Sequence, residues 1–344
     1  LIGSFTLKRK AHAKFLIQSL TRPSKCYIGS DTMKPTVIFW LLNSLSMLDI
    51  TLNTSDRQRT IETILACQHP FGGFGGGPDQ VGHLAQTFSS ISALVILLGE
   101  ADEKIVKETW NRVNIKQIYK WVLSLKSPEG GFSMQQDIKL DDDKLHVGEV
   151  DTRATYCVLA IATLLNFLTP HLARGLPEFI ASCQTYEGGI ASIPHGEAHC
   201  GYTSCGIASD FLLKSLSDSI PMVSLDYDAC LDWMCRMQAL PIEGGGFRGR
   251  TNKLVDGCYN WWCAGSFPII GALISEKHDS LIHEAEQDID YEDLTFYDRQ
   301  SLQEYALLVS QVRSVDGGLC DKPSLDPDLY HTHYILSGLS SSQH

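Results

Sequence analysis

Apolar residues recur three and four positions apart over most of the chain, a pattern that predicts amphipathic helices. Two kinds of helical segment alternate along it. The first kind, such as Asp56–Gln68 and Ile115–Leu125, has one apolar and one polar face. The second kind is apolar nearly all round, as buried helices are, and comprises Thr87–Leu98, Arg153–Leu168, Tyr202–Leu213, Tyr259–Ile274 and His331–Leu339. No segment shows the alternation typical of a strand, so the fold is predicted to be all-α.

A pair of glycines followed by an apolar residue recurs between the two kinds of helix. The first glycines of the five pairs are Gly72, Gly130, Gly188, Gly245 and Gly317. Their spacings are 58, 58, 57 and 72 residues, the last being longer because the acidic segment Asp279–Asp293 is inserted. Glycine suits these places because it adopts the positive φ that a helix C-cap needs. A near-constant period above 50 residues indicates repeated supersecondary units.

Alternating amphipathic and apolar helices with this period predict an α-α barrel (toroid) built from repeated helix pairs with Gly-Gly-apolar turns. The apolar helices would then stand parallel around a central cavity. An open helical solenoid is the alternative architecture. We expect residues 1–33 to form an N-terminal helical segment and residues 34–344 to form a single barrel domain.

Composition narrows the possible functions. A chain of 344 residues with 44% hydrophobic content can bury a large core. Its net charge of −12 argues against a nucleic-acid partner. The longest apolar runs, Ala93–Leu98 and Val158–Leu168, are too short to span a bilayer, and the N-terminal residues lack the apolar core of a signal peptide. Eleven cysteines without a Cys-x-x-Cys pair indicate a reducing compartment, which we take to be the cytosol.

Polar residues stand at equivalent positions near the start of the apolar helices. They are His83 and Gln86, Asp151 and Arg153, His199 and Tyr202, Asp256, Cys258 and Tyr259, and Tyr330 and His331. In a barrel the N-termini of the inner helices face one end of the cavity, so these side chains are expected to share one pocket. Helix N-termini also carry partial positive charge and unpaired N–H groups, which favour bound anions.

Asp256, Cys258 and His331 are the sharpest chemical set within that pocket. Carboxylate, thiolate and imidazole are all zinc ligands, and three protein ligands leave the fourth position open, as a catalytic site requires. The same residues would also arise from a helix N-cap aspartate beside a buried cysteine.

A basic cluster directly precedes the Asp-x-Cys pair in a chain that is acidic overall. Arg250 and Lys253, with His199 and Tyr259, form a candidate site for a phosphate group, since Arg binds phosphate bidentately and Lys adds a point charge. A solvated basic loop is the alternative. A further set near the starts of the apolar helices predicts either ordinary core packing or a tunnel for a long apolar ligand: Tyr156, Tyr202, Cys205, Trp262 and Tyr334, with Trp40 from an earlier helix.

Two acidic runs are interpreted as solvated loops. The run from Asp141 to Lys144 lacks the helical Asp-Asp-x-x-Asp spacing of the magnesium motif of terpene synthases. The run from Glu284 to Asp293 is a block of like charges, which is typical of solvent-exposed segments.

Five stretches closely resemble the protein prenyltransferase β-subunit family, and its farnesyltransferase members in particular. They are GGFGGGPDQVGHLAQTF, GEVDTRATYC, EAHCGYTSCG, GGGFRGRTNKLVDGCYNWW and DKPSLDPDLYHTHYILSGLS. The resemblance extends from about Lys34 to the C-terminus, most of the chain. It implies an enzyme that transfers a farnesyl group from farnesyl diphosphate to the cysteine thiol of a C-terminal C-a-a-X sequence. It also implies a cytoplasmic heterodimer with an α subunit that adds a catalytic lysine, and protein substrates such as small GTPases.

The resemblance also implies roles for individual residues. Zinc would be held by Asp256, Cys258 and His331, and magnesium would be positioned by Asp321. The diphosphate would be bound by His199, Arg250, Lys253 and Tyr259. The isoprenoid tunnel would be lined by Tyr202, Cys205, Trp262, Tyr156 and Arg153, with Thr36 and Tyr334 in its floor. The peptide substrate would contact Trp40, Tyr330 and Arg153.

The chain departs from the family pattern at three places. Thr36 stands where the farnesyltransferase members carry tryptophan, and a small residue there is a feature of the type I geranylgeranyltransferase β subunit. Cys200 replaces a glycine, and Leu325 stands where a lysine is found. Four alternative functions are left open beside the main interpretation: a type I geranylgeranyltransferase β subunit, a terpene cyclase-like α-α barrel, a non-catalytic helical scaffold and an α/α-barrel glycosidase.

Overall fold

The computed structural model describes residues 6–23, 25–136, 138–140, 143–145, 148–281, 295–311 and 316–343. It contains two compact units: Ala13–Leu176, here the N-terminal unit, and Leu1–His12 with Pro177–His344, here the C-terminal unit. Asp141, Asp142 and residues 284–293 lie outside the described residues, so the interpretation of the two acidic runs stays a prediction.

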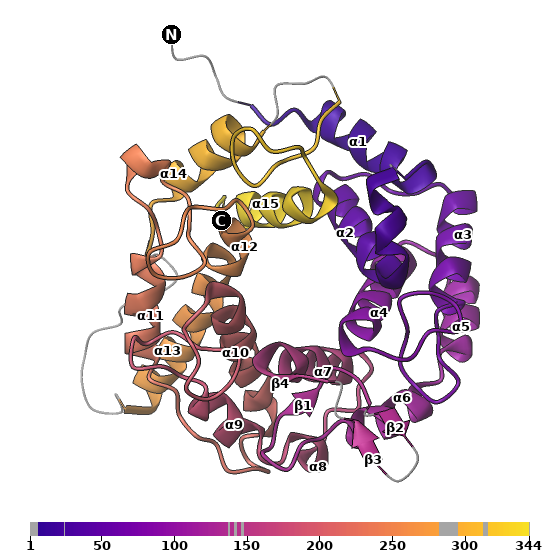
Figure 1. Ribbon diagram of the computed structural model, residues 1–344, viewed down its shortest axis with the longest axis horizontal. Coiled ribbons are helices and arrows are strands. Elements are labelled where there is room, and N and C mark those ends of the chain that lie inside the picture. The colour runs from indigo at the N-terminus through magenta and orange to yellow at the C-terminus, as the bar shows by residue number, and fades with distance from the viewer. Residues whose placement is uncertain are drawn as a thin grey trace. The chain divides into compact units, whose positions relative to one another are not determined.

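The N-terminal unit is helical, with a row of neighbouring helices that are apolar nearly all round. In this row α2 (Lys34–Met47) packs against α4 (Leu84–Leu98), and α4 packs against α7 (Thr152–Leu164) (Figure 1). The amphipathic helix α3 (Thr54–Leu65) packs against α2 and α4. The remaining helical segments are α5 (Glu103–Arg112), α6 (Ile115–Ser124), α8 (Pro170–Ala173) and a 3₁₀ run over Lys25–Met33. Helices α1 (Arg9–Thr21) and α9 (Leu176–Ser182) span the boundaries between the units.

The C-terminal unit repeats this arrangement. Helix α10 (Cys200–Leu213) contacts α12 (Tyr259–Trp262) and α13 (Phe267–Leu281), and α12 contacts α15 (Leu329–Ser341). Helix α11 (Tyr227–Arg236) packs against α13, and α14 (Arg299–Glu304) continues into a π-helical turn over Tyr305–Ser310. Short 3₁₀ turns cover Lys214–Leu216, Pro241–Glu243 and Ala264–Ser266.

Most predicted helices are confirmed to within a few residues at their ends, but the predicted single helix Tyr259–Ile274 is wrong. The segment forms α12, a 3₁₀ turn and then α13. Pro268 at the start of α13 explains the break, because proline has no N–H to donate and its ring clashes with the preceding helical turn.

The sequence shows no strand-like alternation, yet the structure contains two short strand pairs beside its helices. Strand β1 (Phe132–Ser133) pairs antiparallel with β4 (Val150–Asp151), and β2 (Ile138–Leu140) pairs antiparallel with β3 (Asp143–Leu145). These strands have two or three residues each, which is too short for a period of two to be recognised in the sequence.

Four of the five Gly-Gly turns are preceded by a glutamine whose side chain bonds the start of the next amphipathic helix, and at the Gly130 turn Lys126 bonds the Leu172 carbonyl instead. The Gln184 amide donates to the carbonyl oxygen of Asp226 and accepts from its N–H, both at 2.9 Å. Gln238 makes the same pair of bonds to Asp298 at 2.8 and 2.9 Å. Gln68 donates to the Arg112 carbonyl and accepts from the N–H of Asn114. Where this glutamine occurs, it therefore positions the start of the following helix.

In the fifth repeat the glutamine, Gln311, bonds residues just before α1. Gln311 accepts from the Lys8 N–H at 2.8 Å and donates to the Thr6 carbonyl. The fully buried His12 bonds the same Gln311 Oε1 through Nε2 at 3.0 Å, and its Nδ1 accepts from the Gly318 N–H at 3.0 Å. An acceptor at Nδ1 requires neutral His12 with its hydrogen on Nε2.

The geometry of His12 predicts a pH dependence of stability. Burial, together with the nearby Lys8, lowers the pKa of His12 against the raising effect of Gln311. As the pH falls through the ordinary histidine pKa of about 6.5, His12 therefore takes up a proton in the unfolded chain but stays neutral in the folded chain. We expect the free energy of unfolding to decrease as the pH falls below about 6.5, by up to about 1.4 kcal/mol per pH unit.

Urea denaturation at several pH values would measure this decrease. The matched variant is His12→Asn, whose side-chain oxygen can still accept from Gly318 but cannot titrate. The slope of stability against pH should be smaller in the variant than in the wild type. Equal slopes would contradict the prediction.

Candidate functional site

Helices α12 and α15 approach each other unusually closely. A Cβ atom at Gly338 would overlap the backbone of Asn260, and one at Gly257 would lie 2.5 Å from Ile335 Cδ1. Glycine at both positions lets α12, and the residues that lead into it, touch α15 without this overlap. The approach places Cys258, at the start of α12, beside His331 in the first turn of α15.

Asp256 reaches the same place at the end of a turn. Arg248 pairs with Val255, and the Asp256 N–H donates to the Phe247 carbonyl at 3.1 Å. Its carboxylate then accepts from the N–H of Cys258 at 2.9 Å. Aspartate at a helix start commonly bonds the backbone in this way, so capping and presentation of the carboxylate coincide.

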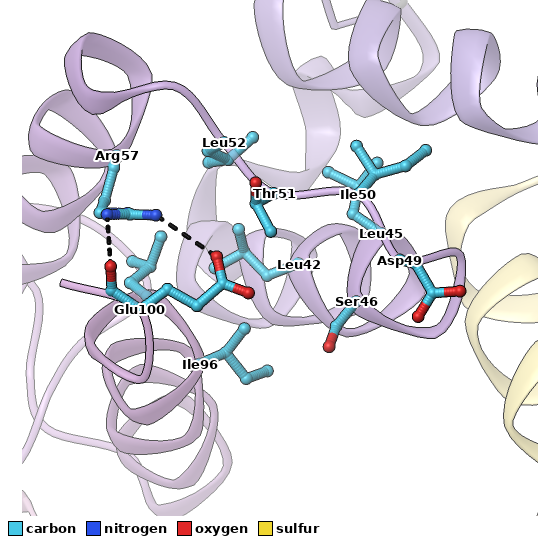
Figure 2. Close-up of a pocket in the computed structure, with 11 residues that line it drawn as sticks. Leu42, Leu45, Ser46, Asp49, Ile50, Thr51, Leu52, Arg57, Ile96 and Glu100 are labelled. Carbon is cyan, nitrogen blue, oxygen red and sulfur yellow. Dashed lines mark hydrogen bonds and ion pairs between the residues drawn. The ribbon is translucent and has the colours of Figure 1, made fainter.

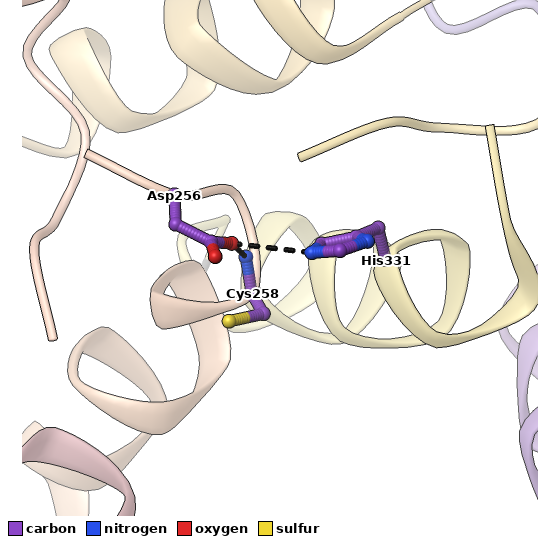
Figure 3. Close-up of side chains that lie close together, drawn as sticks. All are labelled: Asp256, Cys258 and His331. Atoms are coloured by element: carbon purple, nitrogen blue, oxygen red, sulfur yellow. Dashed lines mark hydrogen bonds and ion pairs between the residues drawn. The ribbon is translucent and has the colours of Figure 1, made fainter. Parts of the chain in front are cut away.

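Asp256, Cys258 and His331 form a metal-ligand group (Figure 3). One potential ligand atom from each lies within 4.8 Å of the others, and this is the one such group of three or more found among the described residues. His331 Nε2 lies 3.3 Å from Asp256 Oδ1. On its other side, His331 Nδ1 lies 2.6 Å from the carboxylate of Asp328, which fixes the ring and leaves Nε2 facing the group.

The charges of this group suit a divalent cation. Burial opposes the charged forms, yet the bond between Asp256 and His331 lowers the pKa of Asp256 to about 2 and, with Asp328, raises that of His331 to about 9. Burial and the Asp256 charge raise the pKa of Cys258. Protons on His331 and Cys258 thus occupy positions that a cation would take, because metal binding releases the protons of its ligands. A carboxylate, a thiolate and an imidazole fit zinc with an open fourth position.

Asp321 lies against this group through its backbone. The Gly257 N–H and the Tyr305 hydroxyl both donate to its carbonyl oxygen, each at 3.0 Å. Its side chain is buried, Lys322 bonds Oδ2, and Oδ1 has no hydrogen-bond partner among the described residues. A buried carboxylate oxygen without a partner is costly and is well suited to a cation such as magnesium.

A second group, suited to an anion, adjoins the metal-ligand group. His199 caps α10 and its Nδ1 accepts from the Gly201 N–H at 3.0 Å, so Nε2 carries the hydrogen and donates to the Tyr259 hydroxyl at 3.1 Å. The Tyr259 ring lies over Gly249, where any Cβ would overlap it. Burial, with the Arg250 charge, lowers the pKa of His199.

The cations of the anion group differ in their surroundings. Arg250 forms an ion pair with Glu197 and is half-buried. Lys253 is exposed, next to Asn252, whose backbone has a φ of 60°. The structure therefore brings His199, Tyr259 and Arg250 together and places Lys253 on the same turn.

Aromatic side chains predicted to line a tunnel gather beside both groups in the C-terminal unit. The Trp262 and Tyr334 rings lie 4.6 Å apart, and the Tyr202 and His199 rings lie 5.6 Å apart. Tyr330 accepts a bond from Trp262 Nε1 at 3.2 Å, and Cys205 is buried on α10.

The other predicted tunnel and peptide residues belong to the N-terminal unit. The Thr36 hydroxyl on α2 bonds Gln86 and Ser89 on α4, each at 3.0 Å. The Tyr156 ring lies 5.8 Å from that of Phe88. Arg153 bonds the helix-capping Asp151 at 3.0 Å. The roles predicted for these residues and for Trp40 stay predictions.

A cavity of about 270 Å³ in the N-terminal unit lies apart from every predicted site residue. Figure 2 shows its lining at the C-terminal ends of α2 and α4, including Leu42, Leu45 and Ile96. Arg57 crosses one side of it to bond the Glu100 carbonyl at 3.2 Å. Nothing in this lining resembles the ligand sets described above.

The chain is similar to known proteins over nearly its whole length. The family model of the prenyltransferase alpha-alpha toroid domain matches residues 7–344, so the chain belongs to that family. The predicted all-α barrel fold is thereby confirmed. A solved structure, the Candida albicans protein geranylgeranyltransferase-I complexed with GGPP, matches over 98% of this chain and 91% of its own, with a TM-score of 0.77. At 22% identity it supports the fold alone.

The curated relatives are more specific. The protein farnesyltransferase subunit beta of Arabidopsis thaliana is 32% identical over 98% of this chain and 73% of its own length. The corresponding subunits of Schizosaccharomyces pombe and Pyricularia oryzae are each 34% identical over 98% of this chain, covering 78% and 63% of their own lengths. The resemblance to farnesyltransferase β subunits is confirmed. The chain spans 63% of the Pyricularia oryzae relative. None of the described helices has the length and apolar character required to cross a membrane.

Sequence reasoning missed two residues at these sites. Asp328 precedes His331 by three positions and caps α15, and Glu197 precedes His199 by two. The Asp328 spacing is a usable signal, because a cap aspartate three residues before a histidine on a helix can reach its ring.

The contact between α12 and α15 generates a stability prediction. Gly338→Ala should lower the free energy of unfolding by about 1–3 kcal/mol, the usual cost of overpacking, because the added methyl group meets the Asn260 backbone. It should also weaken binding of a divalent metal, since Cys258 and His331 are carried by these two helices.

Denaturant unfolding and metal titration would measure the two effects. The control is Gly271→Ala on α13, where the added methyl group would lie at an ordinary van der Waals distance, 3.7 Å, from the Phe296 ring. An equal effect of both substitutions would show that the helix contact is not the cause.

Proposed function

We propose that the chain is the catalytic β subunit of a protein farnesyltransferase. It transfers a farnesyl group from farnesyl diphosphate to the cysteine thiol of a C-terminal C-a-a-X sequence. One observation carries the proposal: the metal-ligand group of Asp256, Cys258 and His331 lies next to the anion group of His199, Tyr259 and Arg250. The two groups adjoin because Cys258 and Tyr259 are consecutive in the chain. This arrangement is suited to bringing a thiol and a diphosphate ester together.

Asp256, Cys258 and His331 would hold zinc in this proposal. When bound, zinc supplies a Lewis acid that stabilises the substrate cysteine as a thiolate, the nucleophilic form. The chain's own part is to orient the ligands. Asp328 fixes the His331 ring, and the backbone N–H of Cys258 fixes the Asp256 carboxylate.

His199, Arg250, Lys253 and Tyr259 would bind the diphosphate and stabilise the negative charge that develops as it departs. Arg250 and Lys253 supply positive charge. Because His199 donates to the Tyr259 oxygen, the hydroxyl hydrogen of Tyr259 can be given to a phosphate oxygen. Donors aimed at developing charge typically contribute about 10²–10³ in rate each.

The remaining predicted residues complete the substrate sites. Asp321 would position magnesium on the diphosphate, using the unpartnered Oδ1. The farnesyl chain would lie along apolar and aromatic side chains, which are Tyr202, Cys205, Trp262, Tyr334, Tyr156, Arg153 and Thr36. The peptide would contact Trp40, Tyr330 and Arg153.

The partners follow from the same function. The chain would act in the cytoplasm as an obligate heterodimer with a prenyltransferase α subunit, on C-a-a-X proteins such as small GTPases. The relatives that support this are named as β subunits.

The second candidate is a type I geranylgeranyltransferase β subunit, and the observation favouring it is Thr36. Its small side chain is bonded back to Gln86 and Ser89 on the neighbouring helix, so it occupies little space. A competition assay between the C15 and C20 diphosphates, with the α subunit present, distinguishes the two. Preference for the C20 substrate would favour this second candidate.

The zinc assignment predicts the effect of Cys258→Ala. The variant should lose stoichiometric zinc and peptide binding, because two ligands hold zinc much more weakly than three, while farnesyl diphosphate affinity stays within about twofold. Metal analysis and equilibrium binding would measure this, with Cys67→Ala in the N-terminal unit as a control for loss of a buried thiol. Retention of stoichiometric zinc by Cys258→Ala would refute the ligand assignment.

The magnesium assignment predicts the effect of Asp321→Ala. At saturating substrates this variant should lose most of the stimulation of transfer by magnesium, because the carboxylate that positions the ion is gone. The control is Asp326→Ala, which removes an exposed carboxylate five residues away. An unchanged magnesium response in Asp321→Ala would remove Asp321 from the site.

A further inference from the structure

The hydroxyl of Tyr330 is directed at a metal ligand. Tyr330 precedes His331 in the first turn of α15, and its hydroxyl is hydrogen-bonded to the side chain of Cys258 at the start of α12. Cys258 is buried, with 3% of its surface exposed. The bond therefore lies in a region with little water to replace it.

The direction of this bond follows from a second contact. Trp262 Nε1 lies 3.2 Å from the Tyr330 oxygen, and an indole N–H can only donate. The Tyr330 oxygen is thus an acceptor toward Trp262, and its own hydrogen is the one left for Cys258. Trp262, Tyr330 and Cys258 form a chain of hydrogen bonds that all point toward the sulfur.

Packing holds the Tyr330 ring in this position. The ring makes edge-on contacts with His331 at 4.9 Å and with Tyr334 at 4.7 Å. The glycine-mediated contact between α12 and α15 fixes the distance between the helices that carry the two bonded groups. The orientation of the hydroxyl is therefore set by several independent contacts.

We propose that Tyr330 is a positioning residue for the metal centre, whose hydroxyl donates to the Cys258 thiolate and holds it in the orientation of a ligand. This inference rests on the proposed zinc site. It gives Tyr330 a role beyond the peptide contact expected from the resemblance.

A hydrogen bond of this kind changes the ligand as well as its position. A donor to a thiolate withdraws electron density from sulfur and stabilises the anion in a buried site. Bonded in this way, Cys258 would be a weaker electron donor to a bound metal than a bare thiolate. Outer contacts of this type typically contribute about 10–100-fold in metal affinity.

The test uses cobalt(II) as a spectroscopic probe in the full chain, purified together with the proposed α subunit and freed of metal. In Tyr330→Phe the sulfur-to-cobalt charge-transfer absorption should shift to lower energy, because the unbonded thiolate is a stronger donor. Cobalt(II) affinity, measured by competition with a chelator, should fall by about 10-fold or more.

Two further variants make the result specific. Tyr334→Phe removes a hydroxyl from the neighbouring ring on the same helix and should leave the absorption energy unchanged. Trp262→Phe removes the upstream donor and should shift the absorption in the same direction as Tyr330→Phe, by a smaller amount. Thermal unfolding of each variant would confirm that it is folded. If Tyr330→Phe does not fold, the shift in cobalt absorption is measured in Trp262→Phe instead.

The outcomes separate the inference from the proposed function. If the wild type binds cobalt(II) with sulfur charge transfer and Tyr330→Phe matches it in energy and affinity, the inference is wrong and the metal site stands. A shift in Tyr334→Phe as large as that in Tyr330→Phe would also overturn it, since general packing would then be the cause. If the wild type shows no sulfur-to-cobalt absorption, the proposed metal site itself fails.

Discussion

The close contact between α12 and α15 is the constraint on which the proposed chemistry depends. Gly338 and Gly257 remove the side chains that would otherwise separate the two helices. As a result Cys258 and His331, 73 positions apart in sequence, present their ligand atoms to one point, and Tyr330 can reach across to the sulfur. Protein interiors are packed densely enough that one added methyl group would be felt at this point.

The proposed site is built largely from residues that also begin helices. His199 caps α10 and Asp328 caps α15. The Asp256 carboxylate accepts from the N–H of Cys258, the residue just before α12. Each therefore satisfies backbone groups that would be unpaired at a helix start and, at the same time, presents a polar atom to the site. The same side chains are needed to cap the helices and to form the site. The helical repeat therefore gathers polar groups at the starts of its helices.

Sequence reasoning reached the repeat and the ligand set, because both depend on spacing along the chain. The glycine pairs marked equivalent positions, and this equivalence joined His331 to Asp256 and Cys258. It did not reach the break at Pro268, since apolar periodicity continues through it. The bond from Tyr330 to Cys258 was equally inaccessible, because it depends on the distance between two helices and on the direction of a hydroxyl.

The bonds of His12 and Gln311 join residues 299 positions apart and so bear on how the chain reaches its native state. Contacts of such long sequence separation form late, because closing a long loop costs entropy before the contact is gained. During synthesis Lys8 and His12 must wait for Gln311 and the turn at Gly318, which follow about 300 residues later. Residues 6–12 then hold in place the repeat that carries His331.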